Sequence, residues 1–203
     1  RGHFPAPTPS RTPTRTPTRT ATPTATRTPT NTPTSTPTAT PVAANATAVI
    51  DASILQSAPS TNTGDAQTLT VSATGNERSL LYFNLGQLPV GAGIVEARLR
   101  LRSTSTTGDP VPILVYGLKR DWQESEVTWE RADATSPWAL AGADSPQSDR
   151  DRAASASAVV SGGQIWYEWD VTELVNAWVK GEQSNHGLLL LASESSGGTY
   201  TFA

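Results

Sequence analysis

Three carboxylates stand close together in the segment DWQESEVTWE, at Asp121, Glu124 and Glu126. A pair of carboxylates can supply the acid and the base of glycoside hydrolysis. The stretch also alternates, and its Trp122 and Trp129 are explained more simply by a core strand in which Glu124 ties down a loop. We therefore predict that the chain is not an enzyme.

Other catalytic and metal-binding patterns are weak. The chain has no Cys, which excludes disulfides, thiolate metal sites and cysteine nucleophiles. His3 and His186 are isolated, and no phosphate-binding loop or transition-metal spacing occurs. Oxygen-bearing side chains around Asp51, Asn62 and Asp65 could hold Ca²⁺, although they lack the order of an EF-hand. We expect no cofactor and no resident metal, with a Ca²⁺ site as the alternative.

A basic row, Arg98, Arg100 and Arg102, occupies every second position of one segment, so a strand would expose all three on one face. Guanidinium groups form bidentate pairs with carboxylates, which suits an acidic polysaccharide. The same row could instead be a solvated face paired with neighbouring acids. Trp138, in the polar segment TSPWALAG, is the tryptophan we expect to be exposed and able to stack on a sugar. The tryptophans expected in the core are Trp122, Trp129, Trp178 and one of Trp166 and Trp169.

The N-terminal arm, residues 1–41, has almost nothing to bury. Between Pro5 and Pro41 it contains no Leu, Ile, Val, Trp or Tyr to offset about 1–2 kcal/mol of backbone entropy per residue. Its prolines favour an extended polyproline II chain. Thr/Pro tracts of this kind are typical of O-glycosylated stalks. The candidate O-linked positions are Thr12, Thr14, Thr16, Thr18, Thr20, Thr22, Thr24, Thr26, Thr28, Thr30, Thr32, Thr34, Thr36, Thr38 and Thr40. Asn45, in Asn-Ala-Thr, is an N-linked candidate.

Charge is divided unevenly between the arm and the rest of the chain. The arm has five of the 15 basic residues and none of the 18 acidic ones, so the remainder has ten basic and 18 acidic residues. Opposite charge could draw the arm onto a neighbouring copy, within about 8 Å at physiological salt, or could simply keep both parts soluble. We expect no nucleic-acid partner, since the remainder is acidic. No apolar run is long enough for membrane insertion.

Residues 42–203 predict an all-β domain. Strand-like segments bounded by Gly, Pro, Asn and Asp occur at 47–56, 67–73, 78–85, 94–103, 111–119, 165–171, 186–193 and 199–203. In residues 94–103, Val95, Ala97, Leu99 and Leu101 alternate with charged residues, which indicates one buried face. Residues 136–164 are predicted to form a long irregular or weakly stranded excursion. The pattern predicts an antiparallel, jelly-roll-like β-sandwich.

One short helix is expected at residues 170–181. Asp170 and Glu173 have the spacing of a capping box, and Gly181 can end the helix. Val171, Leu174, Val175 and Trp178 fall on one stripe. We expect this helix to close one end of the sandwich.

The motifs resemble the DNRLRE family of secreted bacterial β-sandwich modules. They include Phe83-x-Leu85 followed by Leu88 to Gly91, Ala97 to Leu101, Trp122 to Trp129, Asp170 to Thr172 with Trp178, and Asn185 to Leu188, besides Asn62-x-Gly64. The resemblance covers about residues 48–203. It implies a non-catalytic, secreted or cell-surface module of a type that accompanies carbohydrate-active enzymes and in some members binds polysaccharide.

The resemblance also implies one more strand, of the type Pro-x-Leu-x-Val-x-Tyr, after the segment that ends at Ala203. A sheet lacking it would offer unpaired backbone groups to a strand of another copy. The donor candidates are Val49 and Ile50, in the segment 41–50, or the tip at residues 1–7. We therefore expect a structural subunit of an extracellular filament that polymerises with copies of itself, or alternatively a carbohydrate-binding or spacer module.

Overall fold

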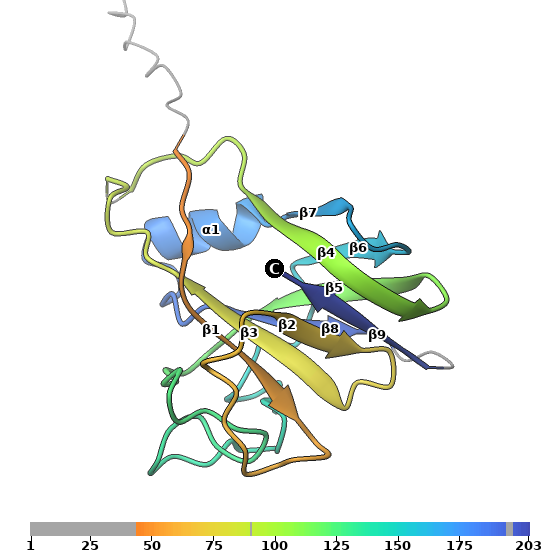
Figure 1. Cartoon of the computed structure of the whole chain (residues 1–203). Coiled ribbons are helices and arrows are strands. Elements are labelled where there is room, and N and C mark those ends of the chain that lie inside the picture. The colour runs from red at the N-terminus through yellow and green to blue at the C-terminus, as the bar shows by residue number, and fades with distance from the viewer. Residues whose placement is uncertain (1–43, 90, 194–196) are drawn as a thin grey trace, which may run out of the picture. The chain divides into compact units, whose positions relative to one another are not determined.

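The computed structural model describes residues 44–89, 91–193 and 197–203. These contain nine strands and one helix (Figure 1). The strands are β1 (Ala48–Leu55), β2 (Leu69–Ser72), β3 (Glu77–Phe83), β4 (Arg98–Gly108), β5 (Val111–Gly117), β6 (Ala156–Val160), β7 (Trp166–Asp170), β8 (Leu188–Ala192) and β9 (Gly198–Phe202). The helix α1 spans Thr172–Val179.

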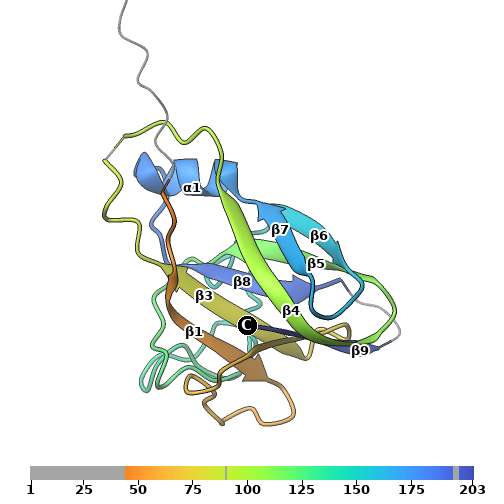
Figure 2. The same cartoon turned by 45° about the horizontal axis from the view of Figure 1, so that its top comes forward.

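Two antiparallel sheets pack face to face, so the predicted β-sandwich is confirmed (Figures 1 and 2). The five-stranded sheet has the order β1-β3-β8-β5-β6, and the four-stranded sheet has the order β2-β9-β4-β7. β4 takes β7 as its partner over Arg98–Arg102 and β9 from Ser103 onward. A register shift between Ser103 and Ser105 marks this change of partner.

The main core lies between the sheets because alternate residues of each strand point inward. Leu99 and Leu101 of β4 meet Trp169 of β7 there, together with Ile113 and Val115 of β5. The Trp169 indole donates a hydrogen bond to the Ile113 carbonyl at 2.8 Å, which ties one sheet to the other. β5 is covered on both faces, since Tyr116 is buried in a second cluster on the opposite side of the sheet.

Helix α1 packs against the main core through the predicted stripe of Val171, Leu174, Val175 and Trp178. Its end is as expected, since Gly181 has a φ of 74° and its N–H donates to the Trp178 carbonyl. The prediction of a capping box was wrong. The cap residue is Val171 and makes no side-chain cap bond, because Asp170 still belongs to β7 and accepts the N–H of Thr172 instead.

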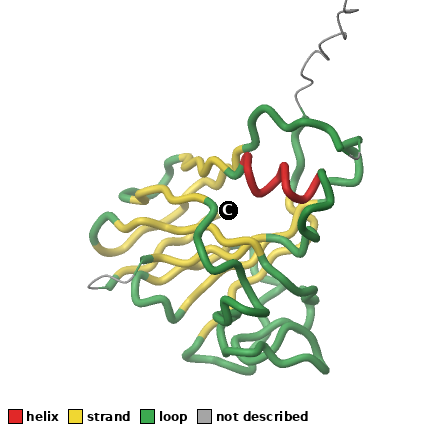
Figure 3. Tube along the Cα trace, turned by 180° about the vertical axis from the view of Figure 1, so that it is seen from behind, coloured by secondary structure: helices red, strands yellow, loops and turns green. Residues whose placement is uncertain are grey.

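A long excursion over residues 118–155 covers the outer side of the five-stranded sheet (Figure 3). It contributes Trp122, Trp129 and Trp138 to the second cluster. Asp149 is fully buried, and its carboxylate accepts hydrogen bonds from the N–H groups of Ala139, Leu140 and Ser145. These bonds satisfy backbone donors in the turns of this loop. The sheet therefore has a core on each face.

Two strand predictions need correction. Trp122 to Trp129 forms turns rather than a strand, because its backbone bonds connect neighbours such as Val127 and Gln123. β4 begins only at Arg98, which leaves Val95 78% exposed. β6 lies inside the segment predicted to be irregular or weakly stranded, and its small residues show little periodicity.

Candidate functional site

The outer face of β4 and β7 carries most of the charged side chains of the four-stranded sheet. Across this pair Arg98 faces Asp170, Arg100 faces Glu168 and Arg102 faces Trp166. The intervening residues Leu99, Leu101 and Trp169 point into the core. The six side chains of the three facing pairs therefore point outward. We call them, together with Gln164, the β4–β7 face.

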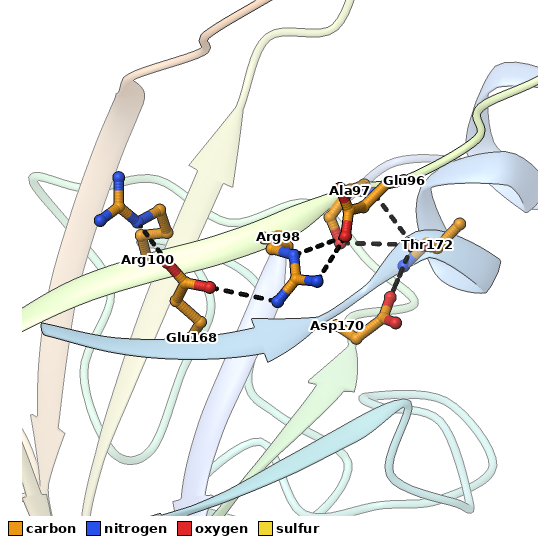
Figure 4. Close-up of polar contacts among 7 residues, drawn as sticks. All are labelled: Glu96, Ala97, Arg98, Arg100, Glu168, Asp170 and Thr172. Atoms are coloured by element: carbon orange, nitrogen blue, oxygen red, sulfur yellow. Dashed lines mark hydrogen bonds and ion pairs between the residues drawn. The ribbon is translucent and has the colours of Figure 1, made fainter. Parts of the chain in front are cut away.

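Two of the three arginines pair with carboxylates on the β4–β7 face or next to it (Figure 4). Glu168 lies 3.2 Å from Arg98 and 2.8 Å from the Nε atom of Arg100. Arg98 also pairs with Glu96, and the hydrogen bonds and charge of Glu96 raise the pKa of the Arg98 guanidinium. The middle of the face is therefore an ion-pair network rather than a free positive patch.

One end of the face is acidic. Hydrogen bonds from the hydroxyl and the N–H of Thr172 lower the pKa of Asp170, which stays ionised (Figure 4). Glu96 lies at the same end. A cleft of about 810 Å³ adjoins it, lined by Val95, Glu96, Ser155, Ala156, Ser157, Asp170, Thr172 and Glu173. This acidic end of the face would therefore repel an anionic ligand.

The other end combines an aromatic ring with an arginine that has no acidic partner. Trp166 is 55% exposed, and the Arg100 guanidinium lies 5.2 Å from its ring centroid. Arg102 forms no salt bridge with any described residue; its Nη2 donates to the neutral Gln164 Oε1 at 2.5 Å. The positive charge available to an anionic ligand is therefore concentrated at Arg102, beside Trp166.

The loop of residues 161–165 joins β6 of one sheet to β7 of the other and is fixed by Tyr167. The Tyr167 hydroxyl accepts the N–H groups of Ser161 and Gly162 and donates to the Gly162 carbonyl. Gln164 ties this loop to β4 through its N–H bond to the Ser103 carbonyl at 2.6 Å. The exposed ring of Trp166 thus stands on a rigid turn and an antiparallel ladder.

An exposed tryptophan among charged and hydroxyl side chains on a sheet is the kind of surface that binds sugars. A model of carbohydrate-binding module family 96 matches residues 42–203, which is most of the chain. The chain belongs to carbohydrate-binding module family 96. No curated protein matches the chain. The family match supports the carbohydrate-binding part of the resemblance, and assignment to the DNRLRE family stays a prediction.

The expectation that Trp138 is exposed was wrong for this family 96 module. Only 5% of the residue is exposed, because the excursion over residues 118–155 folds back onto the sheet. Its indole donates to the Thr128 carbonyl at 3.0 Å, and Arg120 lies 5.6 Å from its ring centroid. Trp138 therefore offers no free ring face to a sugar.

The sequence placed Trp166 and Trp169 together as core candidates without separating them. The signal was present in WYEWD, residues 166–170, because a strand puts Trp166 on the same face as the charged Glu168 and Asp170. Trp169 falls on the opposite face and is fully buried. Trp122, Trp129 and Trp178 are buried as expected.

The three clustered carboxylates serve different local contacts. Asp121 pairs with His186 Nδ1 at 2.7 Å. Glu124 accepts the Asp51 N–H at 2.9 Å, which confirms its role in tying a loop, and Glu126 accepts the N–H of Ala134 at 2.9 Å. A carbohydrate-binding module is a non-catalytic class of domain, in agreement with the prediction that the chain is not an enzyme.

No metal centre is found in the described ranges, where no group of three or more His, Cys, Asp or Glu side chains converges. At the proposed Ca²⁺ position, the Asn62 amide donates to the carbonyls of Glu124 and Val127, and its oxygen accepts the Gly64 N–H. Asn62 therefore links its own loop to the loop of residues 124–127. In the same described part, no helix has the length and apolarity to cross a membrane.

The assembly and glycosylation candidates have different outcomes. Val49 and Ile50 belong to β1, an edge strand that pairs with β3 of the same chain, and their role in joining copies stays a prediction. Val49 is exposed and Ile50 half-buried. Asn45 is exposed. Thr12 to Thr40 and the tip at residues 1–7 lie outside the described residues.

Proposed function

We propose that this module binds a polysaccharide on the β4–β7 face, with Trp166 as the stacking platform. The observation that carries the proposal is the exposure of Trp166 between charged neighbours, although large apolar rings are normally buried. An indole ring can cover the apolar face of a sugar, while the surrounding arginine and carboxylate groups bond its hydroxyls. The contact from Arg100 holds the ring in place before a ligand arrives.

The polysaccharide we favour is acidic. Among the described residues Arg102 has only a neutral side-chain partner, so its remaining N–H donors can take a carboxylate in a bidentate pair. Arg100 stands next to it, whereas Glu96 and Asp170 lie at the opposite end of the face. A uronate carboxylate would therefore be bound at the Trp166 end and repelled at the other.

The proposal is tested by affinity electrophoresis and calorimetry of the whole chain on a panel of acidic and neutral polysaccharides. Trp166→Ala should abolish binding, and Arg102→Ser should weaken binding of uronate polymers by about tenfold, the loss of one charge-assisted contact. The matched controls are Val159→Ala, an exposed apolar residue of β6, and Arg152→Ser, an exposed arginine in the segment before β6. Retention that is unchanged in Trp166→Ala would refute the proposal.

We also propose that the chain acts outside the cell and that its arm is an O-glycosylated stalk. The support is the Thr/Pro composition of residues 1–41 together with the family match over residues 42–203. Intact-mass measurement of material from the native source tests the sugar coat. A mass equal to the bare 21.4 kDa would remove that part of the proposal.

A second candidate function is self-assembly into an extracellular filament. It is favoured by one edge of β4: its pairing with β9 begins at Ser103, and only one further bond, from the Ala203 N–H to the Arg102 carbonyl, lies beyond it. Within the described ranges no strand flanks Arg98–Leu101 on that side, so an added strand could bind there. Electron microscopy of the whole chain and of a variant lacking residues 1–7 tests this candidate. Filaments from the first alone would support it, and monomers from both would exclude it.

A further inference from the structure

Gln164 has a left-handed backbone, with a φ of 61°. A residue with a Cβ is strained in this region, whereas glycine adopts it without cost. The two preceding residues, Gly162 and Gly163, are glycines that do not have a positive φ. The β6–β7 loop therefore has a residue with a long side chain at its strained position, although glycine would fit the backbone better.

The Gln164 side chain makes two hydrogen bonds, both to β4. Its Nε2 donates to the Thr104 carbonyl at 2.9 Å, and its Oε1 accepts Nη2 of Arg102 at 2.5 Å. The first bond fixes the orientation of the amide, since only the nitrogen can donate to a carbonyl. The oxygen is thereby turned toward the guanidinium, which it holds without neutralising its charge.

We propose that Gln164 is a positioning residue of the β4–β7 face, which holds the Arg102 guanidinium beside Trp166 in the orientation that receives a carboxylate. This inference rests on the proposed function. One Nη2 hydrogen is used by Gln164, and the other donors of the planar guanidinium remain for the ligand. Because the arginine is already ordered, binding does not have to restrict its side chain. The strained backbone is maintained by these bonds.

The binding test compares polygalacturonate with its fully methyl-esterified form, in which each carboxylate is replaced by an uncharged methyl ester. Gln164→Gly should weaken polygalacturonate binding about fivefold, leave binding of the ester unchanged and keep the unfolding midpoint within about 4 °C of the parent. Gln183→Gly is the matched control, an exposed loop glutamine away from the face. Equal polygalacturonate binding by the Gln164→Gly variant and the parent would overturn the inference.

The double variant Gln164→Gly/Arg102→Ser separates positioning from direct contact. If Gln164 acts through Arg102, the double variant should bind polygalacturonate no more weakly than Arg102→Ser alone. Losses that multiply would mean that Gln164 contacts the sugar itself, which contradicts a positioning role.

A readout without ligand keeps the inference separate from the proposed function. The ¹⁵N relaxation of the Arg102 Nε–H group should report a rigid guanidinium in the parent and a mobile one in Gln164→Gly. Equal mobility in both would overturn the inference even if the face binds sugars. A rigid-to-mobile change in a chain that binds no polysaccharide would support the positioning role while the proposed function fails.

Discussion

The guanidinium of Arg100 lies 5.2 Å from the ring centroid of Trp166, while its Nε atom lies 2.8 Å from Glu168. One side chain thus joins the exposed ring to the ion-pair network of the β4–β7 face. A cation–π contact at an exposed site contributes about 0.5–1 kcal/mol, enough to favour one orientation of the indole. The ring is ordered before binding, which lowers the entropic cost of association.

Glu168 restrains the affinity of this face for anions, because its carboxylate bridges Arg98 and Arg100 and offsets part of their charge. Glu168→Gln should therefore strengthen binding of a uronate polymer by about three- to tenfold. The stability of the fold should change by less than about 1 kcal/mol, since exposed ion pairs contribute little. Calorimetric titration at low salt measures the first effect, and urea denaturation the second.

The matched control for this prediction is Glu182→Gln, which removes the same charge from an exposed position after α1. It should leave the affinity unchanged. An equal gain in both variants would mean that net charge alone governs binding. A loss in Glu168→Gln would mean that the carboxylate itself contacts the sugar.

The fold was largely predictable from local patterns. Alternation with a period of two residues located most of the strands, and the stripe of Leu174, Val175 and Trp178 located the helix. Two features were not predictable. The excursion over residues 118–155 is held by bonds to distant segments, such as those from Arg78 to the Gly142 carbonyl and from Asn62 to the Val127 carbonyl, which leave no local signature. The residues of β6 are too small and too alike to show an alternation of apolar and polar side chains.

The site was predicted only in part. The row Arg98, Arg100 and Arg102 lies on one exposed strand face, as the alternation required. Which of the three is paired depends on the register between β4 and β7, and a single sequence does not state that register. The tryptophan was misplaced because the polarity of the loop around Trp138 suggested exposure, whereas burial there follows from the fold of the whole excursion.

Trp169 should be the most costly tryptophan to remove. It is fully buried, donates to the Ile113 carbonyl across the sandwich and meets the Phe202 ring edge-to-face at 6.1 Å. Trp169→Ala should lower the free energy of unfolding by about 3–5 kcal/mol, because it leaves a cavity and removes a buried hydrogen bond between the sheets. Trp166→Ala should cost less than about 1 kcal/mol. Urea denaturation of the two variants measures the contrast, and equal losses would contradict the assigned burial.

Asp51 should make the fold less stable as pH rises. Burial, and then the charge of Glu124, raise the pKa of its carboxyl above 3.8. The folded state therefore binds the proton more tightly than the unfolded state, so stability falls between pH 3.8 and the folded pKa and stays lowered above it. Asp51→Asn should remove this decline and melt higher than the parent at pH 7. Melting curves from pH 3 to 8 test it.

The control for the pH profile is Asp133, whose pKa moves the other way. Hydrogen bonds from Thr135 and Ser136 hold the pKa of Asp133 below 3.8. Its contribution is present above pH 3.8 and is lost as pH falls through the folded pKa. Asp133→Asn should therefore lower stability at pH 7. If both variants shifted the melting curve in the same direction, the assignment for Asp51 would be wrong.

Gly64 should tolerate no side chain. A Cβ at this position would lie 2.3 Å from the Glu124 carbonyl oxygen, the same atom that accepts the Asn62 amide at 2.7 Å. Gly64→Ala must push these loops apart and should cost about 2–3 kcal/mol, or about 5–10 °C in the unfolding midpoint. Gly93→Ala is the matched control, because nothing lies within 4 Å of its Cβ position. Since Gly64 and Glu124 lie in different loops, an unchanged midpoint in Gly64→Ala would show that the two loops are not held in contact.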